Sequence, residues 1–503
     1  MTGLRLTWVQ PEDLVGHELR QAAEDGRDAA EIAGRWYAAG GAPAPDRAGV
    51  SPEPASPALR SLAGRLLDEL AELPVPRAGA EPTELAAIRA ACPSWPTAPR
   101  DPAGAGGTAV PGDAPGPPEP WDGGPRAALT QPALHAAWLG RAAGCLLGKP
   151  VEKLPLAGIR ALGRATGNWP LRTWFTARGV PAGLAAAYPW NRRSAPTSLA
   201  ENIDGMPEDD DLDYPLLNLL LLRRHGPEFT TAQLARVWLD ELAAGRTFTA
   251  ERIAYRNLLA GIEPPETARY RNPFREWIGA AIRADVHGWT HPGDPASAAA
   301  QAHRDATLSH TANGVYGAMF VAAVIAAAAR SADVHACLRA GLRVVPPRSR
   351  LAEAVRLGIE TARGQREFDA VADVLHAELG HYHWVHAVPN AALLAAALTH
   401  ADGDFSGSIC RAVSGGWDTD SNGASAGSIA GLLAGHPARL PDRWTAPLKN
   451  RLTTSVGGFH GTGFDTLAEL TREATRTVRT ETDTDTETPT DTHTHTDTET
   501  EAR

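Results

Sequence analysis

The segment Val413-Ser-Gly-Gly-Trp-Asp418-Thr-Asp420-Ser421-Asn422-Gly423 places two carboxylates and one hydroxyl within four consecutive residues. Glycine then recurs at every fourth position on one face of a predicted helix, at Gly423, Gly427, Gly431 and Gly435. Each glycine weakens a helix by about 1 kcal/mol relative to alanine, so the row indicates close approach by a second helix. The segment therefore predicts oxygen ligands at the N-terminus of a closely packed helix, which favours a hard cation.

Calcium binding and helix capping are the alternative interpretations of this segment. The spacing Asp418-x-Asp420-x-Asn422-Gly423 matches the first half of an EF-hand loop, but the twelfth position, which needs a bidentate Glu, is Ile429. An Asp before a helix can instead cap the free amides of its first turn. Capping explains one carboxylate but not the second together with Ser421.

A second acidic cluster, Glu208-Asp209-Asp210-Asp211, lies upstream of this segment and precedes a helix that we expect to begin near Pro215. Acidic residues are common at helix starts, which is the ordinary explanation of such a run. Four consecutive carboxylates nevertheless repel one another unless a cation or solvent compensates them. If the two clusters meet in the fold, they form a dinuclear metal site.

A third segment, Ala137 to Glu152, again has glycine at four-residue spacing and predicts another closely packed helix, which ends near Pro150. Glu152 follows that end, where a carboxylate can point into a cavity. Taken alone, a Glu at such a position is more typical of the surface.

A fourth segment, Ser309 to Ala318, begins an apolar helix. Free amides at a helix start can bind phosphate, and Gly314 and Gly317 permit close backbone approach. The lone His310 in this segment is more typical of a satisfied core residue than of a ligand.

Composition favours an all-α protein, because 43% of the 503 residues are apolar and β-branched or aromatic runs are few. The net charge is −11, but residues 481–503 hold eight acids against one Arg, so the remainder is close to neutral. With no basic stripe in the sequence, neither nucleic acid nor a membrane surface is an expected partner.

The four cysteines, Cys92, Cys145, Cys337 and Cys410, are far apart, and the sequence begins with no signal peptide. These features predict a cytoplasmic location. The longest apolar run, Gly314 to Ala329, is shorter than a bilayer span and predicts a buried helix of a soluble protein.

Four regions follow from the changes in composition. Residues 1–95 have helical stretches such as Pro11 to Trp36 and Pro57 to Leu73, and their role is open. Residues 96–126 are rich in Pro, Gly and Ala and predict a linker. Residues 128–475 hold every motif described above and are the candidate catalytic domain. From 480 to 503, Thr alternates with Asp, Glu or His, which predicts a disordered tail.

Read together and in this order, the four segments resemble the ADP-ribosylglycohydrolase family, over roughly residues 134–474. The most specific parts are Pro-Glu-Asp-Asp-Asp-Leu-Asp-Tyr at 207–214 and Gly-Gly-Trp-Asp-Thr-Asp-Ser-Asn-Gly-Ala at 415–424, supported by Trp384-Val-His-Ala-Val-Pro-Asn390. The resemblance implies an all-α, compact orthogonal helical bundle, here with a small N-terminal helical region added.

The resemblance also implies a site with two Mg²⁺ ions, for which Mn²⁺ can substitute. Its ligands would be Glu208, Asp209, Asp210, Asp418, Asp420 and Ser421. Glu152 would be the catalytic acid or base, which changes the interpretation of that residue given above. Gly314, Val315 and Tyr316 would bind the diphosphate of the substrate, with His310 beside them.

Three positions depart from the family pattern. Cys145 stands where the family commonly has Asp, Glu208 where it has Thr, and Trp417 where it has Gly. These departures bear on substrate choice and metal geometry more than on the fold. Glu208 in particular either ligates a metal or only shapes its loop.

The activity that the resemblance implies is hydrolysis of the C1″ glycosidic bond between ADP-ribose and an acceptor, such as an arginine side chain of a protein. One alternative is a non-catalytic ADP-ribose-binding module, against which the presence of Glu152 and both acidic clusters argues. Another is a hydrolase of a small ADP-ribosylated metabolite.

Overall fold

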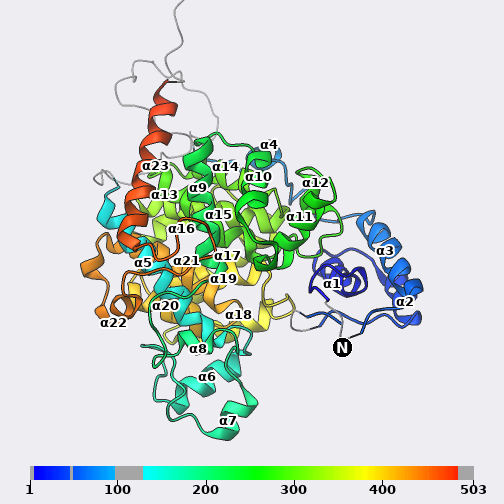
Figure 1. The fold of residues 1–503 in the computed structure, drawn as a ribbon, viewed down its shortest axis with the longest axis horizontal. Helices are drawn as coiled ribbons and strands as arrows, with labels where there is room; N and C mark the ends of the chain where they lie inside the picture. Colours follow the sequence, from blue (N-terminus) through cyan, green and yellow to red (C-terminus); the bar gives the residue numbers. More distant parts are fainter. Residues whose placement is uncertain (1–4, 46–48, 52, 97–128, 485–503) are drawn as a thin grey trace, which may run out of the picture.

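The computed structural model of the protein describes residues 5–45, 49–51, 53–96 and 129–484. Helices make up the ordered elements of these residues, which contain no β-sheet and only two isolated bridges, Met206 with Leu452 and Trp277 with His386 (Figure 1). The predicted all-α fold is confirmed. None of the described helices is both long and apolar enough to cross a bilayer.

Residues 5–96 form four helices: α1 (Pro11–Glu24), α2 (Ala30–Ala38), α3 (Pro57–Ala71) and α4 (Leu85–Ala91). The stretch from Pro11 to Trp36, expected as one helical segment, is divided between α1 and α2. The division follows α1 at Gly26, whose φ of 74° lies in the left-handed region that favours glycine. Figure 1 shows α1, α2 and α3 together at one end of the molecule.

The remaining helices belong to the candidate catalytic domain. Before residue 300 they are α5 (Gln131–Gly148), α6 (Leu156–Ala165), α7 (Ala182–Ala187), α8 (Ala195–Ser198), α9 (Asp210–His225), α10 (Thr231–Glu241), α11 (Thr249–Leu259), α12 (Glu266–Arg269), α13 (Asp285–Thr290) and the start of α14 (Pro295–Ala306). They continue as α15 (Ala312–Ala328), α16 (Val334–Leu342), α17 (Arg350–Gly364), α18 (Phe368–Leu379), α19 (Ala387–His400), α20 (Phe405–Ser414), α21 (Thr419–Ala434), α22 (Asp442–Thr445) and α23 (Phe464–Thr484). Short 3₁₀ turns are η2 (Lys149–Val151), η3 (Ala244–Arg246), η4 (Ile278–Arg283), η5 (Pro437–Arg439) and η6 (Ala446–Leu448).

The glycine rows of α5 and α21 face each other. A Cβ atom added at Gly144 would collide with the carbonyl of Gly423, and one added at Gly140 with that of Gly427. The reverse additions collide in the same way, so the two backbones pack without side chains between them. The second helix whose close approach each glycine row predicted is therefore the helix that carries the other row. Gly435 is the exception: it ends α21 with a φ of 73° and is not part of the packed face.

Helix α9 begins earlier than expected, at Asp210 instead of near Pro215. Asp209 caps it, because its carboxylate accepts a hydrogen bond from the amide of Asp211 at 3.0 Å. Pro215 lacks an amide hydrogen and leaves the carbonyl of Asp211 free. The Nε of Arg141 on α5 donates to that carbonyl at 2.7 Å, which joins the acidic cluster to the glycine-packed pair.

Only some of the regions predicted from composition lie within the described residues. All but the first residue of the predicted linker, 96–126, lies outside them, and so does most of the predicted tail, from 485 on. Helix α23 runs to Thr484 and packs against α5. The predicted end of the domain at 475 therefore falls within a helix.

Candidate active site

The two acidic clusters meet, although about two hundred residues separate them in the sequence. The Oγ atom of Ser421, in the first turn of α21, donates a hydrogen bond to Oδ2 of Asp211 at 3.2 Å. Both clusters line one cavity of about 490 Å³, and Glu152 lines it too. The structure thus brings together the residues that two separate motifs contribute.

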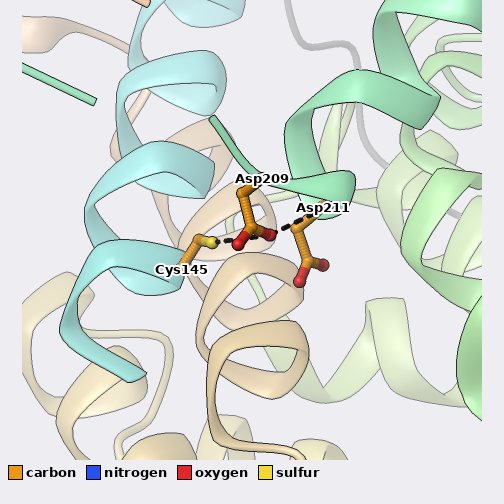
Figure 2. A group of neighbouring side chains, drawn as sticks. All are labelled: Cys145, Asp209 and Asp211. Carbon is orange, nitrogen blue, oxygen red and sulfur yellow. Dashed lines mark hydrogen bonds between the residues drawn. The ribbon is translucent and has the colours of Figure 1, made fainter. Parts of the chain in front are cut away.

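The negative charge of the Asp209 carboxylate is compensated by neighbouring groups of the protein. This carboxylate pairs with the ammonium of Lys149. It also accepts the amide of Asp211 and lies 3.4 Å from Sγ of Cys145 (Figure 2). Burial alone would raise the pKa of this carboxyl, but Lys149 holds it below its ordinary value. The negative charge of Asp209 therefore has a buried counter-ion.

Cys145, Asp209 and Asp211 also place possible ligand atoms within 4.8 Å of one another (Figure 2). Burial raises the pKa of the Cys145 thiol well above its usual range, and Asp209 raises it further. The sulfur is therefore a protonated thiol, which is a poor ligand for a hard cation. The thiol instead donates a weak hydrogen bond to Asp209.

Asp211 has its own cation in Arg141, which is fully buried. Nη2 of Arg141 lies 3.2 Å from Asp211, and Nη1 lies 2.8 Å from Asp285. Glu152 likewise pairs with Lys153 at 2.8 Å. Asp209, Asp211 and Glu152 thus each have a basic partner.

Asp210, Asp418 and Asp420 also line the cavity but have no ion pair with a basic side chain among the described residues. Burial raises the pKa of all three. Neighbouring carboxylates raise it further: Asp209 and Asp420 act on Asp210, and Asp420 acts on Asp418. The pKa of Asp420 reaches about 7. Lys149 opposes these shifts for Asp210 and Asp420, but it pairs with Asp209 and forms no ion pair with either of them.

These donors fit a hard divalent cation. The carboxyl groups of Asp418 and Asp420 lie within hydrogen-bonding reach of each other, and both face a cavity that Asp210 also lines. A cation between them would replace repulsion with attraction, and oxygen-only donors are those that Mg²⁺ and Mn²⁺ prefer.

The loop before α21 is held by Asn390, the last residue of the predicted supporting motif. Its Oδ1 accepts the amide of Asp418 at 3.1 Å and the side-chain amide of Asn422 at 2.6 Å. Its own Nδ2 donates to the carbonyls of Trp384 and His386. Asn390 therefore fixes the position at which Asp418 enters the cavity.

Trp417 has a φ of 55°, in the left-handed region where glycine is favoured. Its indole stacks on the imidazole of His376, with ring centroids 4.0 Å apart and planes inclined by 10°. Nε2 of His376 in turn donates to the carbonyl of Gly415 at 2.8 Å. This stacking holds Trp417 in a backbone position suited to glycine.

Glu152 follows the 3₁₀ turn η2, which continues α5 into the cavity. Its Oε2 accepts a hydrogen bond from Nδ2 of Asn191 at 2.6 Å. The amide of Asn191 donates to the carbonyl of Pro150, so the loop that carries Asn191 is tied to the same turn. Glu152 is thus held in place and lines the cavity, where the predicted catalytic role would place it.

Glu208 lies on the cavity wall but is engaged elsewhere. Its carboxylate pairs with Arg246 in η3 and lies 4.0 Å from Arg193. Of the six predicted metal ligands, it is the one whose charge is compensated by arginine. The structure thus favours the second interpretation of Glu208, in which it shapes the loop.

The predicted phosphate-binding segment does not reach the cavity. His310, Gly314, Val315 and Tyr316 are buried, and none of them lines it. The hydroxyl of Tyr316 instead donates to the carbonyl of Pro82 in the N-terminal region. At the start of α15, the amide of Ala312 donates to Oγ1 of Thr83 at 3.1 Å, so this helix start is already covered.

The neighbouring segment that does line the cavity is Trp277, Ile278, Gly279 and Ile282. Gly279 is a position of close approach, because a Cβ there would collide with Glu251. Lys149 and Asp211 are two further residues of the cavity that were not among the predicted site residues. Asp211 belongs to the acidic run itself, so the run offered that signal.

The family model for ADP-ribosylglycohydrolases matches residues 128–482. The chain belongs to the ADP-ribosylglycohydrolase family. Among solved structures, an ADP-ribosylglycohydrolase-related protein complex is similar, with 20% identity over 69% of this chain and 98% of that chain and a TM-score of 0.42. Comparison with curated proteins found no significant match.

Members of this family are hydrolases that cleave glycosidic bonds of ADP-ribose, and they depend in general on metal ions. This ADP-ribosylglycohydrolase is accordingly a hydrolase that acts on ADP-ribosylated substrates. Its residues 5–96 precede the matched segment.

Proposed function

We propose that this ADP-ribosylglycohydrolase is a Mg²⁺-dependent enzyme that cleaves the C1″ bond between ADP-ribose and a protein side chain. The observation that carries the proposal is the meeting of Asp210, Asp418 and Asp420 at one cavity, without basic partners among the described residues and with Glu152 on the same wall. Those carboxylates are the proposed metal ligands, together with Ser421 and Asp209.

The carboxylate of Asp209 is the least available of these ligands for a metal ion, because it already binds Lys149 and the amide of Asp211. It holds the start of α9 in place, and so directs Asp210 into the cavity. Bound Mg²⁺ would supply Lewis-acid stabilisation and orient the hydroxyls of the terminal ribose. Mn²⁺ offers the same coordination and is expected to substitute.

Glu152 is the proposed general acid or base. As a base it takes a proton from the attacking water while the C1″ bond to the acceptor breaks, and the transition state gains oxocarbenium character. As an acid it returns that proton to the leaving group. Asn191 and Lys153, which hold its two oxygens, position it for either step.

Arginine is the proposed acceptor, and two alternatives stay open to test. A non-catalytic ADP-ribose-binding module would keep the cavity but not turnover. A hydrolase of a small ADP-ribosylated metabolite would need no room for a protein at the cavity mouth. The cavity of about 490 Å³ is within the range of ligand sites and can accommodate the bound nucleotide in either case.

The test is incubation of the full chain with arginine-ADP-ribosylated and serine-ADP-ribosylated proteins and with a small ADP-ribosylated compound, each with Mg²⁺ or with a chelator. Released ADP-ribose is measured by chromatography. Release from the arginine-linked protein with Mg²⁺ only is the expected result. Release from the small compound alone would favour the metabolite hydrolase, and binding without release would favour the non-catalytic module.

A further inference from the structure

Among the described residues of the N-terminal region, Trp8 reaches the candidate active site. Trp8, which precedes α1, lines the same cavity as Asp210 and Asp418. It lies outside the segment that matches the family, which begins at residue 128. The cavity of this enzyme is thus built in part by a region that the family match does not include.

Neighbouring side chains fix the position of Trp8 in the cavity wall. Its indole meets the ring of Phe248 edge to face, with centroids 5.7 Å apart and planes inclined by 82°. The guanidinium of Arg252 lies 5.1 Å from the indole centroid, and Nη1 of Arg252 donates to Oγ1 of Thr7 at 3.0 Å. These contacts orient the ring.

The region that carries Trp8 is anchored to the catalytic domain by buried ion pairs. Arg275, beside the cavity-lining Trp277, pairs with Glu18 at 2.9 Å and with Asp25 at 3.0 Å. Arg350 pairs with Glu81 at 2.7 Å. Breaking a buried ion pair is strongly destabilising, so the region that carries Trp8 is fixed to the catalytic domain.

The charges around the two rings indicate which part of a substrate they meet. Arg252 lies over Trp8, and Arg193 lies over Phe248 at 5.6 Å. A second cationic group, such as a substrate guanidinium, would be repelled there. A neutral planar ring next to anionic phosphates is instead favoured, and ADP-ribose contains one such ring, its adenine base.

We propose that Trp8 packs against the adenine base of ADP-ribose and so makes the N-terminal region part of the substrate site. This inference rests on the proposed function. Stacking of a base on an aromatic side chain contributes about 1 to 3 kcal/mol, so its loss weakens binding by roughly 5-fold to 150-fold.

The test is calorimetric titration of the full chain, in Mg²⁺, with ADP-ribose and separately with ribose 5-phosphate, which lacks the base. The variants are Trp8→Ala, Trp8→Phe, which keeps an aromatic ring, and Trp8→Leu, which keeps apolar volume. Leu6→Ala is the matched control, because Leu6 is 51% exposed and does not line the cavity. Melting temperatures show which variants are folded, and Trp8→Leu serves for the comparison if Trp8→Ala is not.

The expected result is weaker ADP-ribose binding, on the order of 10-fold, for Trp8→Ala and Trp8→Leu, with ribose 5-phosphate unchanged. Trp8→Phe and Leu6→Ala should bind ADP-ribose as the wild type does. Unchanged ADP-ribose binding by the Ala and Leu variants would overturn this inference alone, as would equal weakening of both ligands. A wild type that does not bind ADP-ribose would overturn the proposed function as well.

Discussion

The carboxylates around the cavity differ in what compensates their charge. Asp209 has Lys149, and Asp211 has Arg141. Asp210, Asp418 and Asp420 lack such a partner among the described residues, and their pKa values are raised by burial. Burial of unpaired charge is expensive, so these three are the carboxylates at which we expect a cation to bind.

Glu152→Gln is expected to abolish turnover, by at least about 100-fold in kcat, because glutamine cannot accept or donate the transferred proton. Metal binding should change little, since Glu152 is held by Asn191 and Lys153 and not by the unpaired carboxylates. Rates of ADP-ribose release and Mg²⁺ titration measure the two effects. Turnover that survives the substitution would remove Glu152 from the mechanism.

Asp210→Asn should weaken Mg²⁺ binding more than Glu208→Gln does, by at least about 10-fold. The reason is that Glu208 already pairs with Arg246, whereas Asp210 has no basic partner among the described residues. Mg²⁺ titration of chelator-treated protein compares them, with wild type as the control. A larger effect of Glu208→Gln would restore Glu208 as a ligand.

At the residue level, the sequence predicted Asp418, Asp420, Ser421 and Glu152 at one site because motif spacing and the family resemblance concern short segments. It could not predict the direction of Glu208, since Arg246 lies 38 residues away. Arg246 belongs to no motif, so nothing local in the sequence pointed to this pair.

At the element level, helices α5 and α21 carry Glu152 and the cluster of Asp418, Asp420 and Ser421 toward each other. Their glycine faces allow the backbones to touch, which sets how far apart the two parts of the site lie. Side chains in place of these glycines would separate the helices. The glycine rows are therefore part of the construction of the site.

Gly427→Ala is expected to lower the free energy of unfolding by about 1 to 3 kcal/mol or more, because its Cβ would enter the carbonyl of Gly140. Gly34→Ala in α2 is the matched control. No atom lies within 4 Å of a Cβ placed at Gly34, so alanine should stabilise that helix by about 0.5 to 1 kcal/mol. Urea denaturation measures both. Equal effects would contradict the packing argument.

Spacing alone predicted these two helices, because a row of glycines destabilises a helix unless another backbone packs against it. The residues from Gly314 to Tyr316, which were predicted to bind phosphate, do not line the cavity, and Thr83 and Pro82 contact the start of α15. Those residues lie more than 200 positions earlier in the sequence. The cavity-lining segment from Trp277 to Ile282 lies mostly in the short 3₁₀ turn η4, which is too short for a periodic pattern to reveal it.

At the scale of the whole molecule, the N-terminal region and the catalytic domain share a buried network of charges. Arg350 pairs with Glu81 and also with Glu276 at 2.8 Å. Glu24 at the end of α1 accepts the amide of His383 at 3.1 Å. Composition could indicate that residues 1–95 are helical, but not that they are fastened to the domain, because every partner is distant in sequence.

Glu24→Gln should remove part of the pH dependence of stability. Burial raises the pKa of Glu24 from 4.5 to about 7, so the folded state favours its protonated form. The contribution of Glu24 to folded-state stability is fully present below the pKa of about 4.3 that it has in the unfolded chain. It is lost as pH rises through about 7. The variant is neutral at every pH. Its free energy of unfolding should therefore rise relative to that of the wild type between pH 5 and pH 7, by up to about 3 kcal/mol.

Melting temperatures across that pH range measure the difference. Glu31→Gln, an exposed position in α2, is the control and should track the wild type. A difference between Glu24→Gln and wild type that stays constant with pH would contradict the assignment.

The most direct test of the metal site is the melting temperature of the chelator-treated full chain on addition of Mg²⁺. A cation that binds only the folded state stabilises it by about 2.7 kcal/mol at a hundred times its Kd, so the melting temperature of the wild type should rise by several degrees. The double variant Asp418→Asn, Asp420→Asn should show no rise, although it is expected to fold. A wild-type melting temperature that Mg²⁺ leaves unchanged would contradict the proposed metal site.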